Sequence, residues 1–322
     1  MGTKHWRPLA LALAALGAAA LPFALPDYMV FRFTLALIWS IAILGMVTLV
    51  GISGQISFGH AAFYGVGGYL AAIVSTKAGL PIYWALPASA VFCFALGYGF
   101  GRVAARLGLW YVALATFGLA IAFPQWLKSS YLAPVTGGVQ GYYLDLQGAP
   151  SFLPVSADEW WYLLSLAILL LGMALTARLI DSRTGRAMRA ARDHDLAAAA
   201  NGVNVAHLRA LAFAWSAAFV GVAGCLAAIQ LNFVAPGTYT FWMSLQLLIG
   251  LVIGGLNTVT GAIIGGLFLQ FFPDLTALIG KRLSLPLFGV LLILAVMLMP
   301  NGLAGLLRRL TASLGGKTNA RT

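Results

Sequence analysis

The sequence predicts an all-α, polytopic integral membrane protein of about ten transmembrane helices. Of its 322 residues, 61% are hydrophobic and only 8% are charged, and the mean hydropathy is +0.92. A soluble domain carries roughly 25% charged residues, so lipid must cover most of this surface. Inside lipid every backbone N–H and C=O needs a partner within the protein, which leaves helices or a closed barrel. The apolar runs are about 17–24 residues long, as helices require, and lack the short alternation of barrel strands.

Ten apolar runs are predicted to cross the membrane, and the basic residues orient them. Lys and Arg gather in the short cytoplasmic loops of membrane proteins. With the N-terminus in the cytoplasm, 14 of the 19 Lys and Arg residues fall on the cytoplasmic side and 5 on the outer side. This split predicts cytoplasmic N- and C-termini and explains the net charge of +11 without nucleic acid. The predicted spans are 8–25, 33–51, 61–76, 83–101, 109–127, 161–179, 210–231, 241–257, 259–274 and 286–300.

The whole chain, 1–322, is predicted to form a single transmembrane domain. Lys4 and Arg7 before the apolar run 9–25 also resemble a cleaved signal peptide. An uncleaved first helix is the simpler interpretation, because no soluble domain follows the run. The hydrophilic parts are an external loop segment at 128–160, a cytoplasmic segment at 180–209 and a cytoplasmic tail at 301–322. The external segment is interpreted as a connector, with a docking surface for an extracytoplasmic partner as the alternative.

The cytoplasmic segment 180–209 is predicted to contain one or two short helices at the membrane surface. Residues 184–200 are rich in Ala and Arg, which favour helix, and Asn201 with Gly202 supplies a helix stop. One interpretation is a basic amphipathic helix that binds anionic lipid headgroups. The alternative is a docking helix for a cytoplasmic protein, because the small side chains of 197–200 allow close approach. Three arginines spaced three apart share one broad face, and two aspartates lie elsewhere on the helix: Arg186, Arg189, Arg192, Asp193 and Asp195.

A first glycine-rich stretch, 51–68, is predicted to interrupt the helical pattern inside the membrane. Six of its eighteen residues are Gly, and each costs about 1 kcal/mol relative to Ala within a helix. It carries Ser53, Gln55, Ser57 and His60. Breaks of this kind mark binding sites in transporters, whereas small residues alone also serve tight helix packing. The stretch is therefore either a substrate path or gate, or a packing site, and His60 is expected to be a hydrogen-bonded structural residue.

A second glycine-rich stretch covers 250–266. Its glycines have the spacing of close helix contacts, and Asn257 and Thr258 add hydrogen-bonding groups. In the predicted topology both stretches lie at the cytoplasmic side, between an inward and an outward helix. Asn257 and Thr258 are therefore further candidates for the pathway or its gate.

Sequence patterns for catalysis, metal binding and nucleotide binding are missing. Gly316-Lys317-Thr318 is no phosphate-binding loop, because Thr311 stands where that motif requires Gly. Cys93 and Cys225 lie in predicted spans and are interpreted as packing residues without a metal. No predicted span holds a charged residue well inside it, which disfavours ion-coupled transport. The chain is thus expected to be a non-catalytic subunit whose energy comes from a partner or an ion gradient.

Three stretches together resemble a known family. Residues 51–72, centred on Ser53-Gly54-Gln55-Ile56-Ser57-Phe58-Gly59-His60, are similar to the early membrane motif of branched-chain amino acid ABC permeases of the LivM type. Residues 185–205 resemble the cytoplasmic coupling segment of that family, and 254–261 resemble its late glycine motif. The three occur in the order and spacing of the family, so the resemblance covers nearly the whole chain.

The resemblance implies the permease subunit of an ATP-driven importer in the bacterial inner membrane. It implies a second homologous permease, two cytoplasmic ATPase subunits that use ATP and Mg²⁺, and a periplasmic binding protein, around a chain that binds no cofactor itself. Relatives carry an acidic residue where this chain has the run 196–200 of Leu and Ala. ATPase coupling is therefore expected to rest on Arg186, Arg189, Arg192, Asp193, Asp195, Asn201 and Gly202.

The substrate stays open at this stage. Branched-chain amino acids are the leading candidates, and urea, short amides or other small amino acids are alternatives because similar permeases serve them. An ion-coupled secondary carrier or channel is the alternative of another class. Nothing in the sequence identifies the side chain of a ligand.

Overall fold

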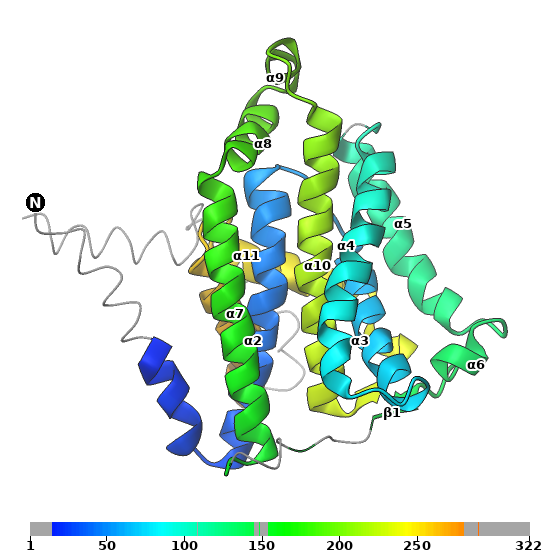
Figure 1. The fold of residues 1–322 in the computed structure, drawn as a ribbon, viewed down its shortest axis with the longest axis vertical. Helices are drawn as coiled ribbons and strands as arrows, with labels where there is room; N and C mark the ends of the chain where they lie inside the picture. Colours follow the sequence, from blue (N-terminus) through cyan, green and yellow to red (C-terminus); the bar gives the residue numbers. More distant parts are fainter. Residues whose placement is uncertain (1–14, 108, 145–147, 149–153, 280–288, 290–322) are drawn as a thin grey trace, which may run out of the picture.

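The computed structural model describes residues 15–107, 109–144, 148, 154–279 and 289, and within them the chain is mainly helical (Figure 1). Of the first predicted span, residues 15–20 are helical and lead into a 3₁₀ turn at Leu21–Phe23. The last predicted span, 286–300, and the tail 301–322 lie outside the described residues except for residue 289. The total of about ten spans and the cytoplasmic termini therefore stay predictions.

Five described helical segments are long and apolar enough to cross a membrane, which confirms the multi-span helical class. They are Asp27–Ile52, Ile82–Ala104, Trp110–Leu127, Ala157–Asp181 and Val205–Leu231. The first comprises α2 (Asp27–Met46) and a π-helical continuation at Val47–Ile52. The others correspond to α4 (Ala85–Ala104) with the preceding 3₁₀ turn Ile82–Trp84, α5 (Leu109–Leu127), α7 (Ala157–Asp181) and α10 (Val205–Leu231).

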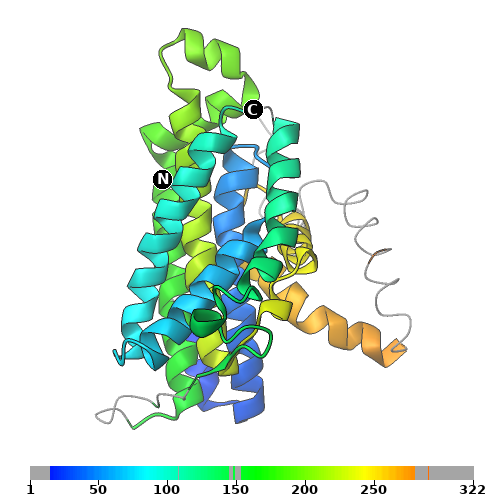
Figure 2. The same cartoon turned by 90° about the vertical axis from the view of Figure 1, so that its right-hand side faces the viewer.

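Three further helices follow the same apolar pattern: α3 (His60–Thr76), α11 (Phe241–Gly254) and α12 (Gly261–Ile279). α11 covers residues 241–254 of the predicted span 241–257 and has 14 residues. At 1.5 Å per residue it is about 21 Å long, short of the ~30 Å hydrocarbon core. In the view turned by 90°, α12 slants away from the main bundle towards the end opposite α8 (Figure 2).

The described residues of the predicted external segment 128–160 include several small elements. It contains α6 (Ala133–Thr136) and β1 (Tyr142–Tyr143), which pairs antiparallel with β2 (Phe233–Val234) after α10. α7 begins at Ala157, four residues before the predicted 161. The reason is a capping box in which the Ser156 and Glu159 side chains each bond the backbone N–H of the other residue.

α10 is the central helix and packs most extensively against α4, α3 and α2. Small residues permit this close approach. A side chain on Gly67 of α3 would collide with the carbonyl oxygen of Gly221, and one on Gly224 would collide with that of Tyr64. Part of the first glycine-rich stretch therefore serves helix packing.

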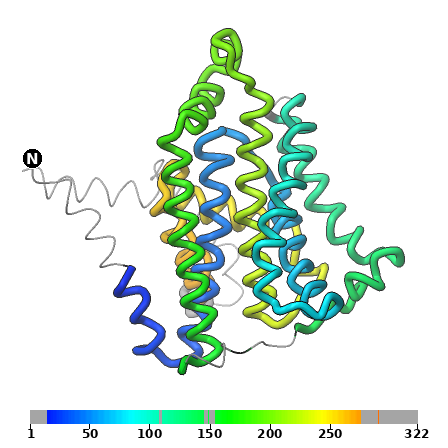
Figure 3. Tube along the Cα trace, viewed as in Figure 1, coloured from blue at the N-terminus to red at the C-terminus, as the bar shows by residue number. Residues whose placement is uncertain are grey.

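The two ends of the bundle differ in charge. At one end α8 (Arg183–Asp193) and α9 (Asp195–Ala200) project beyond α2 and α10 (Figure 3). The opposite end carries β1, β2 and an ion pair between Arg32 of α2 and Asp274 of α12. Most described basic residues lie at the α8 end: Arg102, Arg106, Arg178, Arg183, Arg186, Arg189, Arg192 and Arg209.

Gly67→Ala is predicted to destabilise the protein, and Gly99→Ala is its control. A Cβ on Gly67 meets backbone of α10, and overpacking costs about 1–3 kcal/mol, which outweighs the ~1 kcal/mol gained in helix propensity. Gly99 of α4 has no atom within 4 Å of the added Cβ, so only the propensity gain applies. Thermal unfolding in detergent should show a lower midpoint for Gly67→Ala and an equal or higher one for Gly99→Ala. Equal midpoints for both variants would contradict the close-packing argument.

Candidate functional site

The segment between α2 and α3, residues 53–59, leaves the helical conformation inside the bundle, as the glycine-rich stretch predicted. Gln55 and Ser57 are buried, whereas Ile56 between them is 45% exposed and Phe58 is half-buried. This alternation is that of an extended chain, in which successive side chains point to opposite sides. The polar residues that the sequence singled out therefore face the protein interior, and Ile56 with Phe58 faces outwards.

The donor groups of this segment bond within the subunit, whereas Gln55 Oε1 is buried with no partner among the described residues. The Gln55 side chain donates from Nε2 to Ser53 Oγ at 2.8 Å and to the carbonyl oxygen of Arg209 at 3.1 Å. The Phe58 N–H donates to Thr116 Oγ1 of α5 at 3.0 Å. The segment is thereby joined to both α10 and α5.

His60, the first residue of α3, lies deep in the bundle as a hydrogen-bonded residue. Its Nδ1 is 2.9 Å from Ser57 Oγ and its Nε2 is 2.9 Å from Ser216 Oγ of α10. Ser216 follows the start of α10 by 11 residues, or about 16 Å, in a helix about 40 Å long. α3 therefore begins near mid-depth of the bundle.

A second interrupted segment, residues 232–240, reaches the same depth from the opposite end. It follows α10, passes through β2 and a 3₁₀ turn at Pro236–Thr238, and leads into α11. The Ala61 N–H of α3 donates to Ser244 Oγ of α11 at 2.9 Å, so the two helices begin side by side. Residues 232–240 lie between two predicted spans, 210–231 and 241–257, and contain Pro236 and Gly237.

Aromatic rings surround this junction of α3 and α11. The ring of Phe241 lies 5.8 Å from that of Phe58 and 4.9 Å from that of Phe117 on α5, between centroids. Both contacts join residues far apart in sequence, so no local pattern signalled them.

The turn between α11 and α12, residues 255–260, meets the first break at the α8 end. A side chain on Gly51 would collide with the carbonyl oxygen of Leu256. Gly255 has φ +119°, a conformation that suits glycine, and Thr258 Oγ1 donates to its carbonyl at 3.2 Å. The two glycine-rich stretches therefore touch, with Asn257 exposed beside them.

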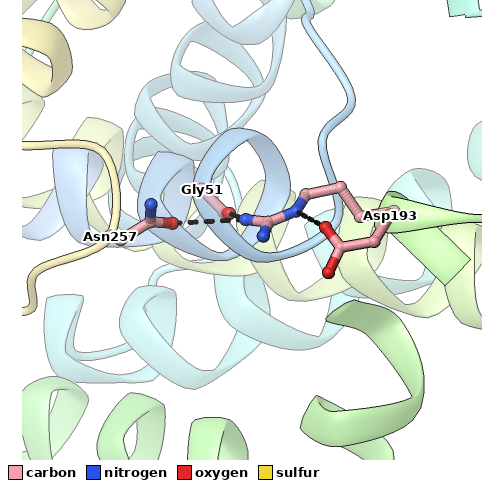
Figure 4. Close-up of polar contacts among 4 residues, drawn as sticks. Gly51, Asp193 and Asn257 are labelled. Atoms are coloured by element: carbon pink, nitrogen blue, oxygen red, sulfur yellow. Dashed lines mark hydrogen bonds and ion pairs between the residues drawn. The ribbon is translucent and has the colours of Figure 1, made fainter. Parts of the chain in front are cut away.

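Arg192 of α8 reaches into this meeting point (Figure 4). Its Nη1 donates to the Gly51 carbonyl oxygen at 2.6 Å and lies 3.5 Å from Asn257 Oδ1, the weaker of the two contacts. Its Nε is 3.0 Å from Asp193 Oδ1, and its aliphatic stem packs beside Gly54. The contact to Gly51 places a cation on a carbonyl at the C-terminal end of the α2 helix, where positive charge is favoured.

The other predicted coupling residues take several positions. Arg186 donates to the Asp181 carbonyl at 2.6 Å and Arg189 to the Ile180 carbonyl at 3.2 Å, so both side chains cap the end of α7. Asp195 pairs with Arg209 at 3.2 Å. The segment forms two helices, and Gly202 takes φ +80° just after α9, as the Asn201-Gly202 pair predicted.

The most exposed large apolar side chain of this segment is Leu196 of α9, which is 84% exposed. The exposed Ala197, Ala199 and Ala200 accompany it, while Ala198 packs inwards. Leu196 and these three alanines form a small apolar surface on α9. The sequence analysis listed Leu196 only within its alanine run and missed it as a candidate.

The described residues contain no group of three His, Cys, Asp or Glu that could hold a metal ion. Cys93 and Cys225 are both buried and free. Within the described residues, the candidate site is therefore held together by hydrogen bonds, close contacts at glycines and packing of aromatic rings.

Apolar spans interrupted by two segments that meet inside the bundle define a polytopic transport protein. The family model of the branched-chain amino acid transport system permease component matches residues 28–296, and the chain belongs to this family. It is 28% identical to the high-affinity branched-chain amino acid transport permease LivM of Escherichia coli K12, over 90% of this chain and 73% of the relative. It is 26% identical to LivH of Salmonella typhimurium, over 84% and 92%. It is 27% identical to BraD of Pseudomonas aeruginosa, over 83% and 91%. No solved structure gave a significant match.

Ser244→Ala is predicted to destabilise the junction of α3 and α11 more than Ser165→Ala destabilises α7. Both serines are fully buried, but the Ser244 hydroxyl accepts from the Ala61 N–H, whereas the Ser165 hydroxyl has no partner among the described residues. A buried N–H left unsatisfied costs about 1–3 kcal/mol. The difference is measured as the midpoint of thermal unfolding in detergent. An equal fall of the midpoint in both variants would show that this hydrogen bond does not stabilise the junction.

Proposed function

We propose that this chain is a translocation subunit of an ATP-driven importer that carries branched-chain amino acids across the bacterial inner membrane. The observation that carries the proposal is the meeting of two interrupted segments at mid-depth in a member of this permease family. Non-helical backbone at membrane depth is tolerated only where protein or a water-filled cavity surrounds it. Such breaks are the best structural pointer to a transport pathway.

The names of the relatives and the apolar surface at the junction of α3 and α11 both favour branched-chain amino acids as substrates. The reported relatives are named as high-affinity branched-chain amino acid permeases. In this chain Ile56, Phe58, Phe117 and Phe241 supply an apolar surface beside the breaks. Such a surface suits an aliphatic side chain better than urea or a short amide, since both of these are polar.

The α8 end is proposed to face the cytoplasm. Eight of the described basic residues lie there, and Lys and Arg are retained on the cytoplasmic side of membrane proteins. The end with β1 and β2 then faces the periplasm, where a binding protein would deliver the substrate. With this orientation the predicted external segment 128–160 is part of the delivery side.

The pathway is proposed to need a second, homologous permease subunit. This chain resembles both LivM and LivH, which are two different permease proteins of one organism, Escherichia coli K12. Two cytoplasmic ATPase subunits would hydrolyse ATP with Mg²⁺, and this chain contributes no catalytic residue. Ser53, Gln55, Ser57 and His60 are proposed to hold the breaks in shape rather than to contact the substrate, because all four are buried and hydrogen-bonded.

The ATPase contact is proposed to centre on the tip of α9, where Leu196 projects. Arg186 and Arg189 are engaged with the end of α7, so their charges are only partly available to a partner. Asp193 and Asp195 are exposed and can add charge complementarity around an apolar anchor.

The function is tested with the whole complex reconstituted in liposomes. The complex contains this chain, its homologous partner, the two ATPase subunits and the binding protein, and labelled leucine and labelled urea are compared as substrates. Leucine uptake that requires internal Mg²⁺ and ATP is expected. Uptake by this chain without ATP, or of urea in place of leucine, would overturn the proposal.

Leu196→Asp is predicted to separate the ATPase from the permease without affecting membrane insertion. A charge placed on a central apolar anchor costs about 2 kcal/mol or more, so copurification of the ATPase and ATP-dependent uptake should fall more than about tenfold. Leu107→Asp is the control, because Leu107 is an exposed leucine at the same end but outside the α8–α9 segment. Normal uptake by Leu196→Asp would remove the tip of α9 from the docking surface.

A further inference from the structure

Arg192 differs from the other arginines of α8 in what it contacts. Arg186 and Arg189 donate to carbonyls only five and nine residues earlier in the chain, at the end of the helix that precedes α8. Arg192 instead donates to Gly51, 141 residues away, and approaches Asn257, 65 residues away. Of these three arginines, Arg192 is the one that reaches both glycine-rich stretches, 51–68 and 250–266.

The contacts of the Arg192 side chain fix its guanidinium relative to the backbone, so that a movement of α8 also moves the guanidinium. The Nε bond to Asp193 at 3.0 Å orients the guanidinium, and the stem of Arg192 packs against Gly54, whose φ of +72° brings its backbone close. The side chain is only about one-third exposed. A planar guanidinium with several fixed donors can hold two acceptors in a defined geometry, which a flexible ammonium group does less well.

The two segments it contacts also touch each other. The backbone at Gly51 lies against the carbonyl of Leu256, with no room for a side chain between them. A displacement of α8 that moves the guanidinium must therefore act on 51–55 and on 255–258 together. Among the described residues no hydrogen bond from α8 reaches the junction at mid-depth, where His60 and Ser244 hold α3 and α11.

We propose that Arg192 is a positioning residue for transport, which couples movement of α8 to the two glycine-rich stretches where they meet, at Gly51 and Asn257. This Arg192 bridge, comprising Arg192, Gly51 and Asn257, holds the two segments together when α8 is in the position seen here. Displacement of α8 by the ATPase pulls the guanidinium away and frees the segments to separate. The inference rests on the proposed function and assigns Arg192 to transmission inside the permease, whereas docking falls to the tip of α9.

The first test is amide hydrogen exchange on the full chain in lipid nanodiscs, with Arg192→Gln compared with Arg189→Gln. Backbone N–H groups of Gly54, Gln55, Gly255 and Thr258 are hydrogen-bonded in the two segments and report on their opening. Arg192→Gln is expected to speed exchange about tenfold in both segments, as loss of a charge-assisted bond implies. Arg189→Gln is expected to leave them unchanged, because its contact lies at Ile180. Unchanged exchange in Arg192→Gln, or a change in one segment only, overturns the proposal.

The second test measures coupling in the reconstituted importer. With Arg192→Gln the ATPase subunits should still copurify and hydrolyse ATP, while leucine uptake per ATP hydrolysed falls about tenfold relative to the wild-type complex. A purely structural role would lower assembly, hydrolysis and uptake together and would overturn the proposal. If the wild-type complex shows no ATP-dependent leucine uptake, the proposed function fails, and hydrogen exchange alone decides whether the Arg192 bridge exists.

Discussion

Backbone groups that leave a helix inside a bilayer need partners from the protein, and this requirement organises the molecule around residues 51–61. The Gly51 carbonyl accepts from Arg192 of α8, the Phe58 N–H donates to Thr116 of α5, and the Ala61 N–H donates to Ser244 of α11. Each partner comes from a different element, and Gln55 adds the Arg209 carbonyl of α10. An unpaired group in hydrocarbon would cost several kcal/mol, so one interrupted segment fixes four elements relative to one another.

Local sequence signals sufficed for the features that depend on local chemistry. The glycines of 51–68 predicted the break, and Asn201-Gly202 predicted the end of α9. These signals act over a few residues, where conformational preference decides the structure. Hydropathy was less informative for 241–257, since it measures the polarity of a run and not whether the run is helical throughout. α11 therefore proved shorter than its apolar run.

Contacts over long sequence separations could not be predicted in this way. Ser244 and Ala61 are 183 residues apart, and Arg192 and Gly51 are 141 apart. The spacing of Arg186, Arg189 and Arg192 predicted one broad helical face, but spacing cannot say whether each side chain meets solvent, lipid or the rest of the chain. In the structure Arg186 and Arg189 cap the end of α7, whereas Arg192 reaches towards the bundle. Alternation in an extended segment likewise turned the polar residues at 55 and 57 inwards and left Ile56 outside.

The α8–α9 segment is fastened to the membrane domain at two separate places, and this limits how it can move. Arg192 holds the end of α8 to Gly51, while Asp195 at the start of α9 pairs with Arg209, whose carbonyl accepts from Gln55. Both connections end on the same five residues, 51–55, because Gln55 and Gly51 belong to one segment. A force applied at Leu196 would therefore reach residues 51–55 through two sets of contacts. One runs from Arg192 to Gly51, and the other from Asp195 through Arg209 to Gln55. Under the proposed function, the cytoplasmic end of the pathway would respond to the ATPase first. The junction at mid-depth, held by Ser244 and His60, would be the fixed point about which that end moves.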